Sequence, residues 1–174
     1  YQSSSLVAKT ICSNDRLELS VELEDFVMQK SNAFRRKIQL VNLAQRYLDV
    51  KLFIYQPFEM DPLGPDKVGL SKDRDALLYE SRFGSVATTL KNSLNEPFSD
   101  YTAGVYGDGF EGTWRDAEDG KLEQNNSAFG RVDSTISLEF NMQALSSVST
   151  YYSFQASLDS ESALRQLKTF SADK

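Results

Sequence analysis

The sequence predicts an all-β fold, an antiparallel β-sandwich of the supersandwich type that ends in one short C-terminal helix. Apolar and acidic residues alternate through residues 17–24, which is typical of a strand with one buried and one wet face. Similar segments recur between polar turns along most of the 174 residues, a spacing typical of sandwiches. The period becomes helical only after residue 158.

The composition fits one folded domain. A chain of 174 residues is long enough to bury roughly 70% of its unfolded surface, so it can build a core without disulfides. With 40% hydrophobic and 25% charged residues, it is far from the composition of a disordered chain. No apolar run approaches the roughly 20 residues that a membrane helix needs, and we expect no contact with a membrane.

Missing residue types exclude several functions. The chain has no histidine, so Ser-His and Cys-His catalysis is excluded within these residues. Its one cysteine, Cys12, cannot form an internal disulfide, which favours a reducing, cytoplasmic location. The net charge of -6 argues against nucleic acid as a partner, and the basic residues 35–37 are too few to reverse that.

The expected strands are residues 6–11, 17–27, 34–43, 48–58, 76–82, 85–91, 101–106, 131–141 and 149–158. Arg35 and Lys37 are expected opposite the acidic face of the preceding strand, where each charge pair contributes roughly 0.2–1 kcal/mol. Residues 48–58 place Val50, Leu52 and Ile54 inward, and the opposite face is partly aromatic. We therefore expect that something covers that second face.

Three segments interrupt or end this pattern. Residues 61–75 contain two prolines and two glycines and are expected to form a loop. Residues 111–134 carry a dense set of charges around three glycines and hold the only tryptophan, Trp114. Asp159 or Ser160 can cap a helix, and its expected apolar face is Ala163, Leu164, Leu167 and Phe170. We divide the chain into a sandwich, residues 1–158, and a helical linker, residues 159–174.

Residues 111–134 are the candidate functional stretch, because they bring many carboxylates together. These acids are Glu111, Asp116, Glu118, Asp119 and Glu123. Paired carboxylates can perform glycoside hydrolysis, and clustered oxygens can bind calcium. However, Gly120 stands where an EF-hand loop needs its fifth-position ligand, and acids beside glycines are usually solvated turn residues. We expect no catalytic residue, no metal ligand and no cofactor here.

Trp114 has three interpretations. With Tyr106, Phe110 and Phe129 it could form a platform on which sugar rings stack. A buried tryptophan that anchors the loop is the simpler interpretation, and we favour it. Contact between this loop and a second domain is the third.

Three stretches carry a family resemblance: DFVMQKSNAFRRKIQLVN, LDVKLFIYQPFEM and, most specifically, GTWRDAEDGKLEQNNSAFGRVDS. With these stretches, the chain resembles the N-terminal β-sandwich domain of glycoside hydrolase family 15, which groups glucoamylases, glucodextranases and prokaryotic trehalases. The resemblance extends from about Leu17 to Phe170. Family members usually have further strands before the equivalent of Leu6, and they often carry proline where this chain has residues 125–127. These departures leave the subfamily open.

The resemblance implies a sandwich placed before an (α/α)6 barrel in which two glutamates hydrolyse α-glucosidic bonds with inversion. Neither glutamate matches a position of this chain. We therefore expect a non-catalytic domain whose partner is the C-terminal catalytic domain of the same protein, with α-glucan or trehalose as a further ligand. The alternative is a free-standing carbohydrate-binding module. The expected contact residues are Trp114, Arg115, Asp116, Asp119 and Phe129.

Overall fold

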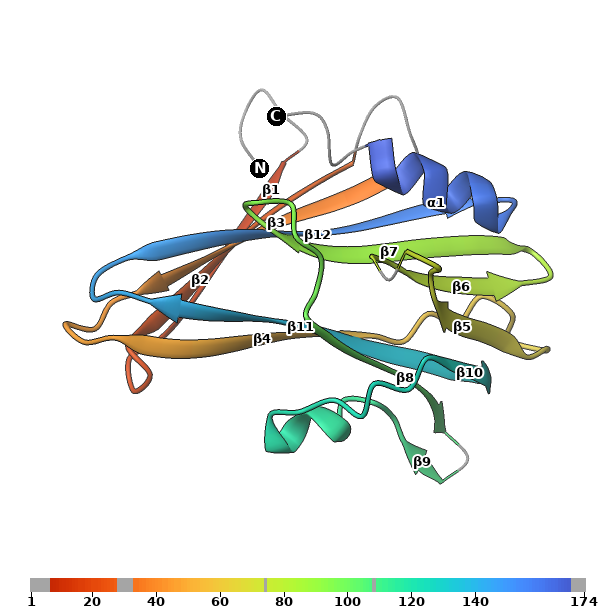
Figure 1. The fold of residues 1–174 in the computed structure, drawn as a ribbon, viewed down its shortest axis with the longest axis horizontal. Helices are drawn as coiled ribbons and strands as arrows, with labels where there is room; N and C mark the ends of the chain where they lie inside the picture. The colour runs from red at the N-terminus through yellow and green to blue at the C-terminus, as the bar shows by residue number, and fades with distance from the viewer. Residues whose placement is uncertain (1–6, 28–32, 74, 108, 170–174) are drawn as a thin grey trace.

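The computed structural model describes residues 7–27, 33–73, 75–107 and 109–169. Two antiparallel sheets lie face to face, and a helix covers part of the outer face of the larger sheet (Figure 1). The predicted fold class is therefore confirmed. No helix in these ranges combines the length and the apolar character needed to cross a membrane.

The larger sheet has eight strands in the order β1-β2-β3-β12-β7-β6-β5-β10. Their bounds are Ala8–Asn14 (β1), Leu19–Val27 (β2), Ala33–Asn42 (β3), Ser147–Ser157 (β12), Gly84–Asn92 (β7), Leu77–Ser81 (β6), Asp66–Leu70 (β5) and Ser127–Gly130 (β10). The smaller sheet has the order β4-β11-β8-β9. Its strands are Leu48–Gln56 (β4), Val132–Met142 (β11), Asp100–Gly107 (β8) and Phe110–Glu111 (β9).

The main core lies between the sheets, where the alternating apolar residues meet. As predicted, Val50, Leu52 and Ile54 of β4 pack against it. From β11, Ile136 is fully buried and Leu138 nearly so. Buried apolar area of this kind stabilises by roughly 25 cal/mol per Å², which makes inter-sheet packing the main source of stability.

Cross-strand charge pairs join β2 to β3, as expected. Lys37 lies 3.8 Å from Glu24, and Arg36 binds Asp25 through two hydrogen bonds of 2.6 Å. Arg35 was expected opposite an acidic residue, but its neighbour on β2 is Phe26. Its guanidinium lies over the ring of Tyr151, 4.3 Å from the ring centroid. Strand register therefore decides which basic residue meets an acid.

Two loop predictions were wrong in part. Residues 61–75 contain strand β5, and residues 111–134 contain strand β10 ahead of the predicted strand of residues 131–141. Strands β5 and β10 pair with each other at the edge of the larger sheet. Both are short and contain glycine, so their local pattern is too weak to compete with the surrounding turn residues. Hydrogen bonding between these two strands, which are distant in sequence, gives them the order that the local pattern does not.

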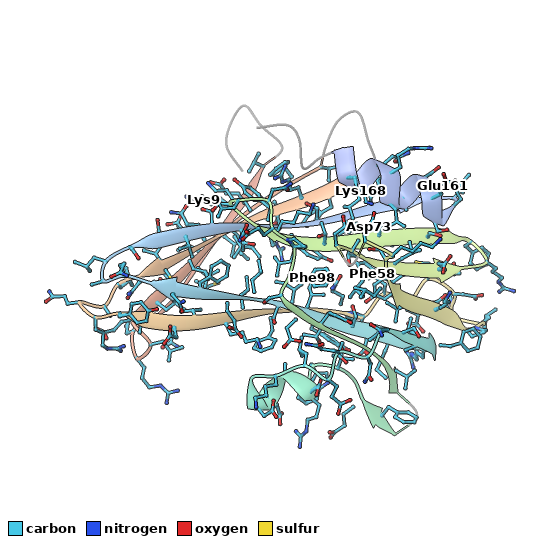
Figure 2. All side chains as sticks on the ribbon, in the orientation of Figure 1. Lys9, Phe58, Asp73, Phe98, Glu161 and Lys168 are labelled. Atoms are coloured by element: carbon cyan, nitrogen blue, oxygen red, sulfur yellow. The ribbon has the colours of Figure 1, made fainter. Side chains whose placement is uncertain are left out.

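The helix α1, Ser160–Thr169, begins where the sequence predicted. The carboxylate of Asp159 accepts a 2.8 Å hydrogen bond from the backbone N–H of Ser162, as a helix cap does. Ala163 and Leu167 are buried against Ala76, which precedes β6, and Ala87 of β7, and Phe170 lies outside the described residues. Lys168 forms an ion pair with Asp73, at the edge of this contact (Figure 2). The helix thus packs on the sandwich.

Candidate functional site

Residues 109–126, here called the edge segment, follow β8, add β9 to the edge of the smaller sheet and then lead to β10 in the larger sheet. The segment contains β9 and the 3₁₀ helix η1, Asp116–Asp119. It lies on the far side of the smaller sheet, away from α1 and the larger sheet (Figure 1). The second face of β4 and β11 is therefore partly covered, as the aromatic pattern of residues 48–58 indicated.

One end of the edge segment is attached to β11 through a buried acid. The backbone N–H of Thr113 donates a 2.9 Å hydrogen bond to Asp133 Oδ2. The hydroxyl groups of Thr113 and Thr135 lie 3.0 Å apart. Gly112 allows this close approach, because a Cβ atom there would lie 2.5 Å from Asp133 Oδ2. Burial raises the pKa of Asp133. Hydrogen bonds from Thr113 and Tyr55 lower this pKa, but burial has the larger effect.

The other end is attached to β4 by a largely buried cation. Lys51 Nζ donates a 2.9 Å hydrogen bond to the carbonyl oxygen of Gly120. It also lies 3.1 Å from Asp100 and 3.2 Å from Glu139. Burial lowers the pKa of Lys51, but hydrogen bonds to these two carboxylates outweigh it, so the pKa is raised and the amine stays charged. Two separate attachments thus hold the edge segment on the sheet.

Trp114 is 43% exposed, so the favoured prediction of a buried tryptophan anchor was wrong. The anchoring is done instead by its neighbour Thr113 and by the attachment at Gly120, which leaves the indole at the surface. The guanidinium of Arg115 lies 5.7 Å from the centre of the Trp114 ring. Arg115 also forms ion pairs of 3.1 Å with Glu111 and 3.0 Å with Glu118.

The remaining predicted site residues lie near one another in sequence but have separate roles. Asp116 Oδ2 accepts a 2.8 Å hydrogen bond from the N–H of Glu123, and burial raises the pKa of Asp116. Asp119 Oδ1 accepts one of 2.8 Å from the N–H of Lys121. Phe129, in β10, is 69% exposed. In the described ranges no three acidic or cysteine side chains gather in a way that could hold a metal ion.

An open hollow of about 800 Å³ lies between the edge segment and the outer face of β8. Its polar lining includes Glu111, Arg115, Asp116, Glu123 and Asn125, and Phe110 stands at its margin. These groups can accept and donate hydrogen bonds to a hydroxylated ligand or to the polar surface of a partner. Among the described aromatic residues, no ring contact links Trp114, Tyr106, Phe110 and Phe129 into a common stack.

Sequence reasoning missed the residues that position this site, Lys51, Asp133 and Thr113. A signal was present in β11, where the face opposite the apolar one carries small polar residues that the structure buries: Asp133, Thr135 and Ser137. A strand with a wet face carries longer polar side chains, so this pattern indicated a covering element. The identity of that element could not be read from β11 alone.

No family model matches the sequence, and no curated protein matches it. Among solved structures, the chain is similar to a bacterial glucoamylase crystallised with acarbose, with a TM-score of 0.73 at 13% identity. That match covers 100% of this chain and 25% of the glucoamylase chain. A putative aldose 1-epimerase from Klebsiella pneumoniae subsp. pneumoniae also matches, with a TM-score of 0.42 at 11% identity, over 95% of this chain and 53% of that one.

At such low identity the likeness to the glucoamylase shows a shared fold and nothing finer. The TM-score of the epimerase match is too low to carry an argument. The described chain thus spans about a quarter of the length of the glucoamylase that it matches.

Proposed function

We propose that this chain is a non-catalytic β-sandwich domain of a glucoamylase-like or trehalase-like α-glucoside hydrolase. It stands before an (α/α)6 catalytic domain and supports that domain through the edge segment. The observation that carries the proposal is the fold match, which covers 100% of this chain but only 25% of the glucoamylase chain. A match that covers all of this chain and a quarter of the other is expected if this chain corresponds to one accessory domain of a larger enzyme.

The proposed contact surface includes exposed aromatic side chains. Phe110 is 63% exposed, Trp114 43% and Phe129 69%, and all three belong to the edge segment or to the strand that follows it. Large exposed aromatic side chains are typical of surfaces that another domain buries. Arg115, Asp116 and Asp119 supply polar groups, which such surfaces usually also carry.

The attachments of the edge segment suit support better than catalysis. Lys51 and Asp133 fix the segment at two points on the smaller sheet, which gives a partner domain a rigid surface. Glu111 and Glu118 are paired with Arg115, and Asp116 holds the backbone of Glu123. The carboxylates therefore organise the segment, and bond cleavage is assigned to the partner domain.

Trp114→Ala tests this proposal in a protein that carries both domains. We expect the melting temperature of the catalytic domain to fall, and kcat/KM on maltose or trehalose to fall with it. In the isolated 174-residue chain the same substitution should change the unfolding free energy by less than about 0.5 kcal/mol, because the indole is a surface group. Phe83→Ala is the matched control, since Phe83 is 62% exposed on a distant turn. Unchanged stability and kinetics in the two-domain protein would remove the proposal.

The second candidate is a free-standing carbohydrate-binding module, and the hollow beside Phe110 favours it. Isothermal titration of the isolated chain with maltooligosaccharides and with trehalose separates the two candidates. A module that uses this hollow should give binding heat that disappears in Phe110→Ala and Glu111→Gln, because both side chains line the hollow. A support domain should give no heat that depends on these two residues.

A further inference from the structure

Strand β1 forms one edge of the larger sheet, and no described strand pairs with its outer side (Figure 1). Six of its seven residues are exposed, and Ile11 is 59% exposed. Proteins usually protect a free edge with proline, a bulge or several charges, because such an edge can pair with another chain. β1 has no proline, its only charged residue is Lys9, and its register with β2 runs without a bulge. It is therefore an unprotected edge.

Alternate residues of β1 direct their backbone N–H and C=O groups to this free side. The hydroxyl of Ser20 in β2 donates a 3.2 Å hydrogen bond to the carbonyl oxygen of Cys12, so the backbone groups of Cys12 face β2. Successive residues of a strand point these groups to opposite sides, so those of Ile11 and Ser13 face outward. An added strand can satisfy these donors and acceptors.

The other sheet edges are less suited to pairing with a second chain. The edge strands β9 and β10 have only two and four residues. β4 is longer, but its neighbour β11 packs against β12 and β7, which leaves β2 and β1 to extend beyond the edge of the smaller sheet. Two copies joined through β4 would bring their β1–β2 hairpins into collision. Two copies joined through β1 keep their smaller sheets apart.

Charge decides how β1 pairs with its own copy. In an antiparallel pair of identical strands, a two-fold axis can pass through Thr10, Ile11 or Cys12 and still bring the outward-facing backbone groups together. An axis at Thr10 or at Ile11 opposes no unlike charges. An axis at Cys12 places Lys9 of one copy opposite Asp15 of the other, and the symmetry repeats this pair. Opposite charges directly across two strands stabilise their pairing.

Both members of this charge pair are accessible. Asp15 is exposed and follows β1 directly. Lys9 projects from β1 (Figure 2), and its side chain is 41% exposed. Its amine lies 2.8 Å from Glu22, but an ammonium has three N–H donors and can bind a second carboxylate as well.

We propose that two copies of this chain associate through β1, antiparallel about Cys12, and join their larger sheets into one. The backbone groups of Ile11 then exchange hydrogen bonds with those of Ser13 in the other copy. The edge segment leads to β10, at the opposite edge of the larger sheet, so this association leaves the proposed contact surface free. It does not depend on the proposed function.

Cys12 reports this register. It is exposed and meets Cys12 of the other copy as a non-hydrogen-bonded pair, with Cα atoms about 4.5 Å apart, within the range that a disulfide spans. Diamide, which accepts two electrons and two protons from a pair of thiols, should therefore give a covalent dimer. In the matched variant Cys12→Ser with Ser13→Cys the thiol lies opposite Ile11, and we expect little covalent dimer. Equal yields would overturn the register.

Sedimentation equilibrium of the 174-residue chain under reducing conditions measures the association itself. We expect a monomer–dimer equilibrium that Asp15→Lys weakens at least about fivefold, because like charges then face each other twice. Combining Asp15→Lys with Lys9→Glu should restore it. Asp49→Lys, at an exposed position of β4, changes the net charge equally and should associate as the wild type does. The melting temperature of each variant verifies its fold.

Hydrogen exchange locates the contact. The amides of Ile11 and Ser13 should become protected as the protein concentration rises, because they bond only to the second copy. The amides of Thr10 and Cys12 bond to β2 and should be protected at every concentration.

A chain that stays monomeric at every concentration excludes the proposal. Association that Asp15→Lys does not weaken, or that protects another edge in place of β1, overturns it as well. None of these results bears on Trp114→Ala in the two-domain protein, so the association and the proposed function can fail separately.

Discussion

The ammonium of Lys51 donates a 2.9 Å hydrogen bond to the carbonyl oxygen of Gly120, the residue that ends η1. Lys51 belongs to the smaller sheet, and its side chain is 18% exposed. The neighbouring carboxylate of Asp100, 15% exposed, also accepts the N–H of Leu122 at 3.2 Å. A charge pair in the sheet therefore holds the end of the edge segment in place.

Lys51→Met should lower the free energy of unfolding by about 1–3 kcal/mol, because it leaves the Asp100 carboxylate without its cation. Urea denaturation measures the loss, and hydrogen exchange at Gly120–Leu122 should become faster. Lys121→Met, on the exposed surface of the same segment, should change stability by less than about 0.5 kcal/mol. Equal effects of the two substitutions would contradict the anchoring role of Lys51.

Gly112 and Gly120 form a matched pair, since both have a positive φ, of 92° and 84°. A Cβ at Gly120 meets no atom within 4 Å, whereas one at Gly112 would lie 2.5 Å from Asp133 Oδ2. Gly120→Ala should therefore cost about 1 kcal/mol, from the left-handed backbone alone. Gly112→Ala should cost clearly more, because it also separates the edge segment from β11. Thermal denaturation compares them, and similar losses would show that the contact with Asp133 is unimportant.

Stability should fall at alkaline pH. Burial, aided by the charge of Asp133, raises the pKa of Tyr55 to about 12 from the ordinary 10.0. Burial likewise raises the pKa of Tyr79 and of Tyr152. A tyrosine whose pKa is higher in the folded state stabilises fully below about pH 10, and this contribution is lost as the pH rises toward 12. Urea unfolding across this range should show a decline that is shallower in Tyr55→Phe. Identical slopes would refute the contribution of Tyr55.

Leu167→Ala tests whether α1 belongs to the sandwich or only links it to another domain. Leu167 is 5% exposed against the larger sheet, so its truncation should cost about 2–3 kcal/mol of the unfolding free energy of the whole chain. Leu158→Ala is the control, because Leu158 is 90% exposed and its loss should be nearly neutral. If Leu167→Ala leaves the unfolding of the sandwich unchanged, residues 159–174 act as a separate linker, as the sequence predicted.

The long strands were predictable, because each carries its own alternation. β3, β4 and β11 begin within one residue of the expected positions, and their inward residues pack in the core. The helix and its cap at Asp159 were predictable for the same local reason. The short strand β5 was not, since only pairing with β6 and β10 orders a segment that is rich in proline and glycine.

The sequence by itself determined the fold class, the order of the long elements and the location of the unusual stretch around Trp114, because periodicity and turn residues act over a few neighbours. Only the tertiary structure decided that Trp114 is exposed and that Lys51 and Asp133 anchor the edge segment. These properties depend on contacts between strands far apart in the chain, which local patterns do not specify.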